Sequence, residues 1–133
     1  MTILKTYARL FVDDTETALP LYETLVGRPA DLRFQFEKAD IEAVGDFLII
    51  GGPAADTAKY RGTVGPVIVD DLDVVVAELV RSGARIEAGP LESATGKFIY
   101  LTHADGVIVE YVQWAPAIAQ RVLQVADSRT TAL

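Results

Sequence analysis

The chain has 133 residues, of which half are hydrophobic and 23% are charged, and its formal net charge is −7. This length and composition predict one globular domain with a substantial core, and the acidic charge argues against nucleic-acid or anionic-membrane partners. The chain has no cysteine, which excludes disulfides, thiol nucleophiles and thiolate metal sites.

The first half of the chain reads as a strand, a helix and three further strands. An alternating apolar segment leads into a helical pattern at 15–26, with Asp14 as its N-cap and Gly27 as the left-handed residue that ends it. Pro20 lies inside this pattern, where its missing N–H is expected to bend or delay the helix. Three short strands are predicted within 32–52.

The same order of elements recurs in the second half. A strand again ends in Val-Asp-Asp, and the helical pattern that follows has Asp71 as its N-cap and Gly83 at its end. Three strands follow this helix too. The sequence therefore predicts a single domain of two strand–helix–strand–strand–strand modules, at 3–52 and 63–114, joined by a Gly-, Pro- and Ala-rich linker at 53–62.

The segment 115–133 follows the second module. Ile118, Val122 and Val125 lie at helical spacing, which predicts a short amphipathic helix and then a frayed tail. The pattern suits packing on the same domain and packing on a partner, and it leaves both open.

Three segments of the duplicated pattern are YARLFVDDTETALPLYETLVG, GPVIVDDLDVVVAELVRSGA and THADGVIVEYVQW. With them the chain resembles the vicinal oxygen chelate superfamily, which includes glyoxalase I, extradiol dioxygenases, and fosfomycin- and bleomycin-resistance proteins. The last segment is similar to the family's closing Asp-Pro-Asp-Gly-x-x-x-Glu-Leu hairpin, with His103 and Ala104 in place of the first Asp and the Pro. The resemblance implies an α+β fold in which two βαβββ modules enclose a cavity. It also implies a homodimer with two equivalent clefts between its subunits.

The resemblance also bears on metal binding. The family's metal enzymes place one ligand on the first strand and one on the last strand of each half, and the matching positions here are Tyr7, Ile49, Val64 and Glu110. Only Glu110 suits a divalent metal, whereas catalytic metal sites normally need at least three protein ligands. His103 lies in the turn before Glu110, where we expect it to be solvated. The chain therefore resembles the metal-free, bleomycin-resistance-like branch, and we expect no metal or other cofactor.

Strand alternation assigns the side chains that face the cavity. The expected ligand-binding residues are Tyr7, Arg9, Phe11, Phe47, Ile49, Val64, Pro66, Ile68, Phe98, Tyr100, Thr102, Ile108, Glu110 and Val112. The register from Phe98 to Thr102 stays open, because a slip of one residue reverses every face. Such apolar and aromatic walls suit a planar or cationic organic ligand. Arg9 and Glu110 either contact this ligand or form a structural ion pair.

Two functions are compatible with this site. The first is a metal-free binding protein that sequesters a bleomycin-, mitomycin- or enediyne-like antibiotic or another natural product, since no catalytic Ser/His/Asp set or phosphate loop is present. The second is a metal-free lyase or isomerase of small-molecule metabolism. In that enzyme a desolvated Glu110 has a raised pKa and acts as acid or base, while Arg9 or Tyr7 stabilises developing charge. The sequence favours binding over catalysis.

The start of the chain bears on its location. MTILKTYARLFVDD lacks the long apolar core of a signal peptide, and no apolar run reaches membrane-spanning length. We therefore expect a cytoplasmic protein with no nucleic-acid or membrane partner. The acidic charge suits solubility, and it would also attract a basic small molecule.

Overall fold

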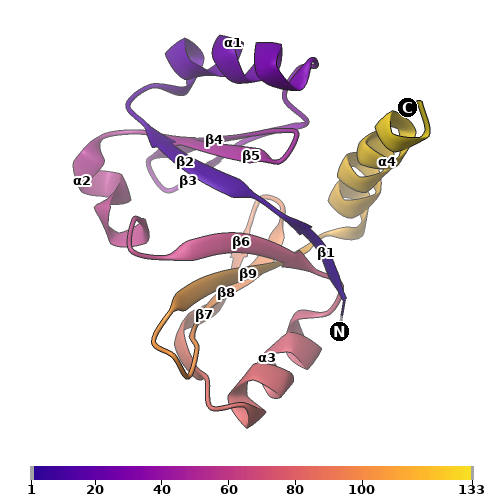
Figure 1. Ribbon diagram of the computed structural model, residues 1–133. Coiled ribbons are helices and arrows are strands. Elements are labelled where there is room, and N and C mark those ends of the chain that lie inside the picture. The colour runs from indigo at the N-terminus through magenta and orange to yellow at the C-terminus, as the bar shows by residue number, and fades with distance from the viewer. Residues whose placement is uncertain (1, 133) are drawn as a thin grey trace.

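The computed structural model describes the backbone of residues 2–132 and the side chains of residues 2–124. Its strands form two sheets that face each other (Figure 1). The strands are β1 (Ile3–Thr6), β2 (Ala8–Val12), β3 (Leu32–Phe36), β4 (Ala39–Val44), β5 (Phe47–Gly51), β6 (Val64–Val69), β7 (Arg85–Ser93), β8 (Gly96–Thr102) and β9 (Ile108–Trp114). One sheet has the order β2-β5-β4-β3 and the other the order β1-β6-β9-β8-β7.

Helices cover the outer faces of both sheets. In Figure 1, α1 (Thr15–Val26) lies over the four-stranded sheet and α3 (Leu72–Arg81) over the five-stranded sheet. The connection between the modules, expected as a linker, contains α2 (Ala54–Thr57) and the short 3-10 helix η1 (Ala58–Tyr60). The last helix, α4 (Pro116–Ala132), lies beside the two sheets. No helix in the described part of the chain is both long and apolar enough to cross a membrane.

The two modules repeat one order of elements, as the sequence predicts. The first is β2-α1-β3-β4-β5 and the second is β6-α3-β7-β8-β9. In each, an aspartate caps the helix: Asp14 accepts a hydrogen bond from the backbone of Glu16, and Asp71 accepts bonds from the two residues that follow Leu72. Gly27 ends α1 with a φ of 86°, a left-handed conformation that glycine adopts without strain. The predicted duplicated α+β fold is confirmed.

Pro20 does not delay the first helix, so the expected delay is wrong. The helix begins at Thr15, five residues before the proline. The N–H that Pro20 lacks would have bonded to the carbonyl of Glu16, and Glu16 is exposed in the first turn. Water can satisfy a carbonyl at that place, so the cost of the proline is small.

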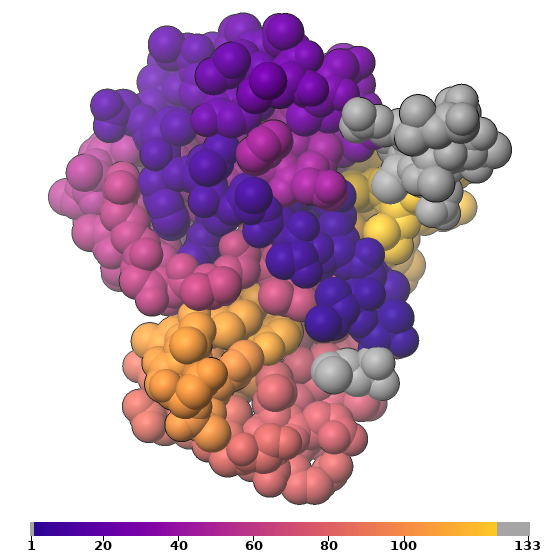
Figure 2. Space-filling model, in the orientation of Figure 1, coloured from indigo at the N-terminus to yellow at the C-terminus, as the bar shows by residue number. Residues whose placement is uncertain are grey.

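The first strand of the duplicated pattern is divided between the two sheets. β1 pairs antiparallel with β6, whereas β2 pairs parallel with β5. Tyr7 lies between them, and its backbone N–H donates to the carbonyl of Pro66 at 3.2 Å. In Figure 2 the indigo N-terminal segment extends from one half of the molecule onto the other. This strand therefore ties the modules together, which strand alternation alone does not predict.

The largest core cluster lies between the sheets, and α4 packs on it. Ile118 and Val122 contact this cluster, and the Arg121 side chain donates to the backbone carbonyl of Asp31 at 2.7 Å. The C-terminal helix therefore packs on its own domain, which decides one question that the sequence left open. Its backbone is helical to Ala132, beyond the short helix predicted, while the side chain of Val125 lies outside the described residues.

Candidate functional site

A cavity of about 80 Å³ lies between the two sheets. Strands of both sheets supply its walls, and β9 runs along it with alternate side chains facing inward. The predicted residues that the structure places along this cavity are Tyr7, Arg9, Pro66, Ile68, Phe98, Tyr100, Glu110 and Val112. Phe98 and Tyr100 therefore face inward, in the register that the sequence left open.

Phe47 and Ile49 face away from the cavity, so their predicted orientation is wrong. The ring of Phe47 lies 5.2 Å from that of Tyr22 on α1, and Ile49 is fully buried beneath the same helix. Their neighbours Leu48 and Ile50 line the cavity instead. Because β5 is buried on both faces and apolar throughout, its alternation carries no signal of which face is which.

Val64 and Thr102 also lie outside the cavity. Val64 is 55% exposed at the start of β6, where the pairing with β9 shifts register before Val67. This irregularity interrupts the alternation that assigned Val64 to the wall. Thr102 is buried, and its hydroxyl donates to the carboxylate of Glu87 at 2.7 Å.

Phe11 and Ile108 border the cavity without lining it. The centre of the Phe11 ring lies 5.4 Å from Arg9 Cζ and 4.9 Å from Arg61 Cζ. Phe11 therefore supports Arg9 through cation–π contact. Ile108 lines a neighbouring groove that shares Phe36, Tyr60, Phe98 and Tyr100 with the cavity.

Sequence reasoning missed the wall formed by β3 and β4, the aromatic residues Tyr60 and Trp114, and the hydroxyl residues Ser93 and Thr95. Leu32, Phe34 and Phe36 alternate along β3 and face inward, a period-2 pattern that was visible in the sequence LRFQF. Tyr60 reaches the cavity from η1, in the segment expected to be a linker, and stacks on Tyr100 with ring centres 6.2 Å apart. The only sequence signal for Tyr60 is an aromatic residue in a segment otherwise typical of a loop.

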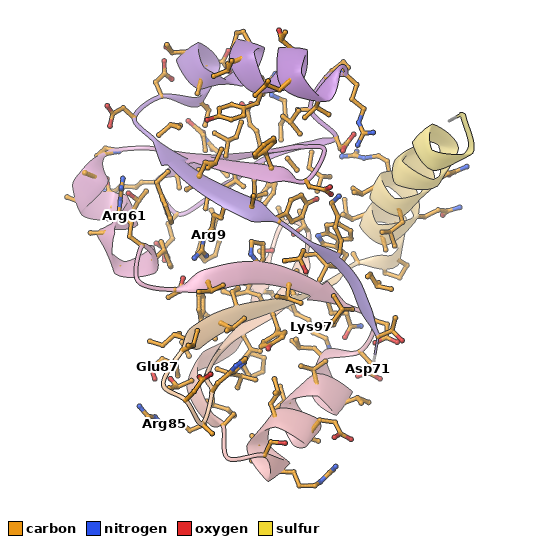
Figure 3. All side chains as sticks on the ribbon, in the orientation of Figure 1. Arg9, Arg61, Asp71, Arg85, Glu87 and Lys97 are labelled. Carbon is orange, nitrogen blue, oxygen red and sulfur yellow. The ribbon has the colours of Figure 1, made fainter. Side chains whose placement is uncertain are left out.

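At one end of the cavity Arg9 and Glu110 form an ion pair. Arg9 Nη1 lies 3.5 Å from Glu110 Oε1, and Nη2 donates to the backbone carbonyl and the hydroxyl of Thr63. The Arg9 side chain is only 5% exposed, and in Figure 3 it points from β2 into the space between the sheets. Backbone and hydroxyl acceptors therefore hold this buried cation together with Glu110, as a charge without water requires.

Burial raises the pKa of Glu110 to about 7. The positive charge of Arg9 and a hydrogen bond with Tyr100 lower this pKa, but they do not offset the loss of hydration. Tyr100 lies directly opposite Glu110 on β8, and burial together with the carboxylate raises the pKa of its hydroxyl. Glu110 is thus a group that both gives and takes a proton near neutral pH.

The other end of the cavity holds Tyr7 and Trp114. Their rings meet edge to face with centres 6.2 Å apart. The Tyr7 side chain is buried, and within the described part of the chain its hydroxyl has no hydrogen-bond partner. Burial raises the pKa of this hydroxyl, and the carboxylates of Asp31 and Asp46 add to the effect.

Comparison with known proteins places this geometry in a family. No protein-family model and no curated protein matches the sequence. Among solved structures, an uncharacterized protein from Methanosarcina mazei is 33% identical and has a TM-score of 0.82, over 86% of this chain and 95% of that one. The two proteins belong to one family.

Two other solved structures share the fold at lower identity. Methylmalonyl-CoA epimerase from Mycobacterium tuberculosis is 18% identical with a TM-score of 0.65, over 88% of this chain and 92% of that one. The Streptomyces coelicolor epimerase in complex with 2-nitronate-propionyl-CoA is 13% identical with a TM-score of 0.64, over 86% and 99%. The chain therefore has the fold of these epimerases, which is the duplicated α+β fold that the sequence predicts.

The residues at the metal-ligand positions implied by the family resemblance do not fit a divalent metal ion. Of the matching positions only Glu110 carries a carboxylate, and its near neighbour is the cation of Arg9. Ile49 faces α1 and Val64 is exposed. Among the described side chains, no group of three or more His, Cys, Asp or Glu is arranged to hold a metal ion.

His103 lies on the other face of the five-stranded sheet from the cavity. Its Nε2 is 2.8 Å from the hydroxyl of Tyr111, and the two rings stack with centres 5.9 Å apart. Tyr111 belongs to the core beneath α3, whereas Glu110 faces the cavity. His103 is therefore half-buried against Tyr111 rather than solvated, and it does not approach Glu110.

The cavity between the two sheets is formed within a single chain. Both of its walls come from the two modules of one molecule. The clefts between subunits that the resemblance also implied are not tested by a single chain. The homodimer itself stays a prediction.

Proposed function

We propose that the protein binds a small, largely apolar organic molecule in the inter-sheet cavity without a metal ion, and so sequesters a natural product such as an antibiotic. The observation that supports this most directly is the buried Arg9–Glu110 pair in a largely apolar cavity, whose other polar side chains are hydroxyl groups. Ligand sites have this composition, with apolar walls and a few polar groups that fix orientation. A buried ion pair adds little stability compared with a hydrophobic pair, so its place at the cavity wall favours a role in binding.

The size of the cavity restricts the ligand. One buried water needs about 10–15 Å³, so a cavity of about 80 Å³ has room for a single ring with small substituents. A whole bleomycin molecule is too large to be enclosed. A small planar compound, or the ring portion of a larger one such as a mitomycin, suits the space.

The charges at the site restrict the ligand further. A cation entering beside Glu110 also meets Arg9, whose Nη1 is 3.5 Å from the carboxylate. Like charges at such distances repel in a poorly hydrated site. A neutral or weakly acidic polar group is therefore the better partner for this end, and the acidic net charge of the chain acts only at longer range.

The pKa of Glu110 favours a second function, metal-free acid–base catalysis. A carboxyl group with a pKa of about 7 is matched to proton transfer at neutral pH. In this function Glu110 takes a proton from a carbon next to a substrate carbonyl and returns it to the same or another atom, as an isomerase requires. Arg9 stabilises the negative charge that develops meanwhile on the carbonyl oxygen.

One experiment tests both functions. Native mass spectrometry of the purified protein identifies a bound compound, which is then incubated with the protein in D₂O. A sequestering protein returns the compound unchanged, whereas an acid–base enzyme converts it or exchanges a carbon-bound hydrogen for deuterium.

Variants test the site itself. Glu110→Gln and Arg9→Ala should each weaken binding by roughly tenfold to a hundredfold, because a hydrogen bond to a charged group contributes about 1.5–3 kcal/mol. Glu42→Gln is the matched control, since Glu42 is a buried carboxylate that pairs with Arg33 away from the cavity. Unchanged affinity in both cavity variants would show that the ligand binds elsewhere.

A further inference from the structure

The cavity carries polar side chains at both of its ends. Glu110 and Trp114 face inward from β9, and four residues of strand place their Cα atoms roughly 13 Å apart. Arg9 pairs with Glu110 at the first end. At the second end, Ser93 and Thr95 line the cavity together with Trp114. These three residues define the hydroxyl end of the cavity.

Sheet pairing places the hydroxyl end. Gly96 of β8 lies opposite both Trp114 of β9 and Ser93 of β7. Because Gly96 has no side chain, Ser93 and Trp114 are the side chains that this row presents. The backbone N–H of Ala115 donates to the carbonyl of Thr95 at 2.8 Å, which holds Thr95 beside the end of β9. Both hydroxyl residues are therefore fixed next to the last residue of β9.

The side chains between the two ends are apolar. Val112 lies on β9 midway between them, and Phe98 is its direct neighbour on β8. Ile68 and Phe34 come from the two facing sheets. The middle of the cavity thus offers dispersion contacts and ring faces to a flat molecule.

The two hydroxyl groups are only weakly bonded to each other. Ser93 Oγ and Thr95 Oγ1 lie 3.3 Å apart, and either group can be the donor. This contact is long, because hydrogen bonds between hydroxyl groups are usually about 2.7–2.8 Å. Ser93 Oγ also accepts from the backbone N–H of Thr95 at 3.3 Å. The contact uses one of the two hydroxyl protons, and among the described residues the other has no acceptor.

We infer that the ligand carries a carbonyl-type acceptor at the hydroxyl end, opposite the group that bonds to Glu110. This inference rests on the proposed binding function and adds the chemical class of the ligand, a flat compound with a polar group at each end. Ser93 and Thr95 then set specificity. A compound of the same shape without the acceptor displaces water from the hydroxyl groups and does not replace its hydrogen bonds.

Two probes of nearly equal shape test the acceptor. In 4-hydroxyacetophenone a phenol hydroxyl and a ketone lie at opposite ends of one ring, whereas 4-ethylphenol has the hydroxyl but no carbonyl. Wild-type protein should bind the ketone about tenfold more tightly, which corresponds to about 1.4 kcal/mol and to one good hydrogen bond.

Variants test whether the two hydroxyl groups cause this preference. The double variant Ser93→Ala/Thr95→Val removes both and should bind the two probes alike, whereas Thr95→Ser keeps a hydroxyl and should retain the preference. Thr57→Val is the matched control, because it deletes the hydroxyl of another buried threonine, which donates to the carbonyl of Ala54 outside the cavity. The preference is a ratio of two affinities of one protein, so a general loss of stability cancels from it.

Calorimetry measures the affinities, and tryptophan fluorescence shows where the probes bind. Trp114 is the single tryptophan of the chain and lies at the hydroxyl end. Glu110→Gln tests the opposite end. It should weaken the binding of both probes by the same factor and keep the preference for the ketone, because both probes carry the phenol that faces Glu110.

The outcomes separate the inference from the function beneath it. Equal affinity of wild-type protein for both probes, a preference that survives the double variant, or a preference that Thr57→Val abolishes overturns the inference and leaves the binding function standing. Failure of wild-type protein to bind either probe, or binding that leaves Trp114 fluorescence unchanged, overturns the binding function itself.

Discussion

Glu110→Gln should change how the stability of the protein depends on pH. Glutamine has the shape of a protonated glutamate and cannot ionise, so the variant resembles the neutral form of the wild-type site. In the folded protein the pKa of Glu110 rises from 4.5 to about 7, mainly through burial. Between these values the folded protein keeps a proton that the unfolded chain has lost. The stability that the neutral carboxyl contributes is therefore complete below pH 4.5 and is lost as pH rises through 7.

The size of this effect follows from the two pKa values. A difference between 4.5 and about 7 corresponds to about 3 kcal/mol, at about 1.4 kcal/mol for each pH unit. Solvent screening reduces this figure little, because the Glu110 side chain is 16% exposed. Wild-type protein and Glu110→Gln should therefore be equally stable near pH 4.5, and the variant should be more stable by about 3 kcal/mol at pH 8.

Urea unfolding of both proteins across this pH range measures the difference. Every other titrating group is common to the two proteins, so its contribution cancels when one free energy of unfolding is subtracted from the other. A difference that stays constant with pH, or a variant less stable at pH 8, would refute the reasoning. Either result would mean that Arg9 keeps Glu110 ionised in the folded protein.

Three further substitutions have defined outcomes. Gly65→Ala should destabilise the protein by about 2 kcal/mol or more and weaken the binding of 4-hydroxyacetophenone. The reason is that the new Cβ would lie 2.8 Å from the Glu110 carbonyl oxygen at a φ of +125°. Urea unfolding measures the first effect and a titration with this compound measures the second. Asp71→Ala should lower the free energy of unfolding by about 1 kcal/mol, since two N–H groups of α3 lose their acceptor. Calorimetry should find the affinity of this variant for 4-hydroxyacetophenone unchanged. Ile68→Ala should cost about 2–5 kcal/mol, because the residue is almost fully buried. The larger cavity of this last variant should favour bulkier ring compounds in competition titrations, and an unchanged preference would place the ligand away from Ile68.

The duplication could be predicted because the residues that begin and end the two helices can be recognised in the sequence. Asp14 and Asp71 cap two helices, and a glycine with positive φ follows each, directly after α1 and one residue beyond the C-cap of α3. These signals are local, because a helix cap depends only on the conformation and hydrogen bonds of a few neighbouring residues. The division of the first strand at Tyr7 could not be predicted in this way, because it depends on hydrogen bonds to a strand some sixty residues later.

The cavity could be predicted only where a polar residue marks the face of a strand. Glu110 is such a marker on β9, and it assigns the side chains two positions before and after it to the same face of the strand. β5 has no such marker, which is why Phe47 and Ile49 were assigned to the wrong side. Tyr60 joins the site through tertiary packing of η1 against β8, and no local pattern indicates such a contact.

The most direct test is a titration of 4-hydroxyacetophenone, followed through Trp114 fluorescence, into protein that has been stripped of metal with a chelator. The titration is repeated after zinc, nickel, manganese or iron is added back. If the ligand is held by the Arg9–Glu110 pair, the affinity is the same in every case and falls in Glu110→Gln. Binding that disappears on chelation and returns with one of these ions would contradict the account.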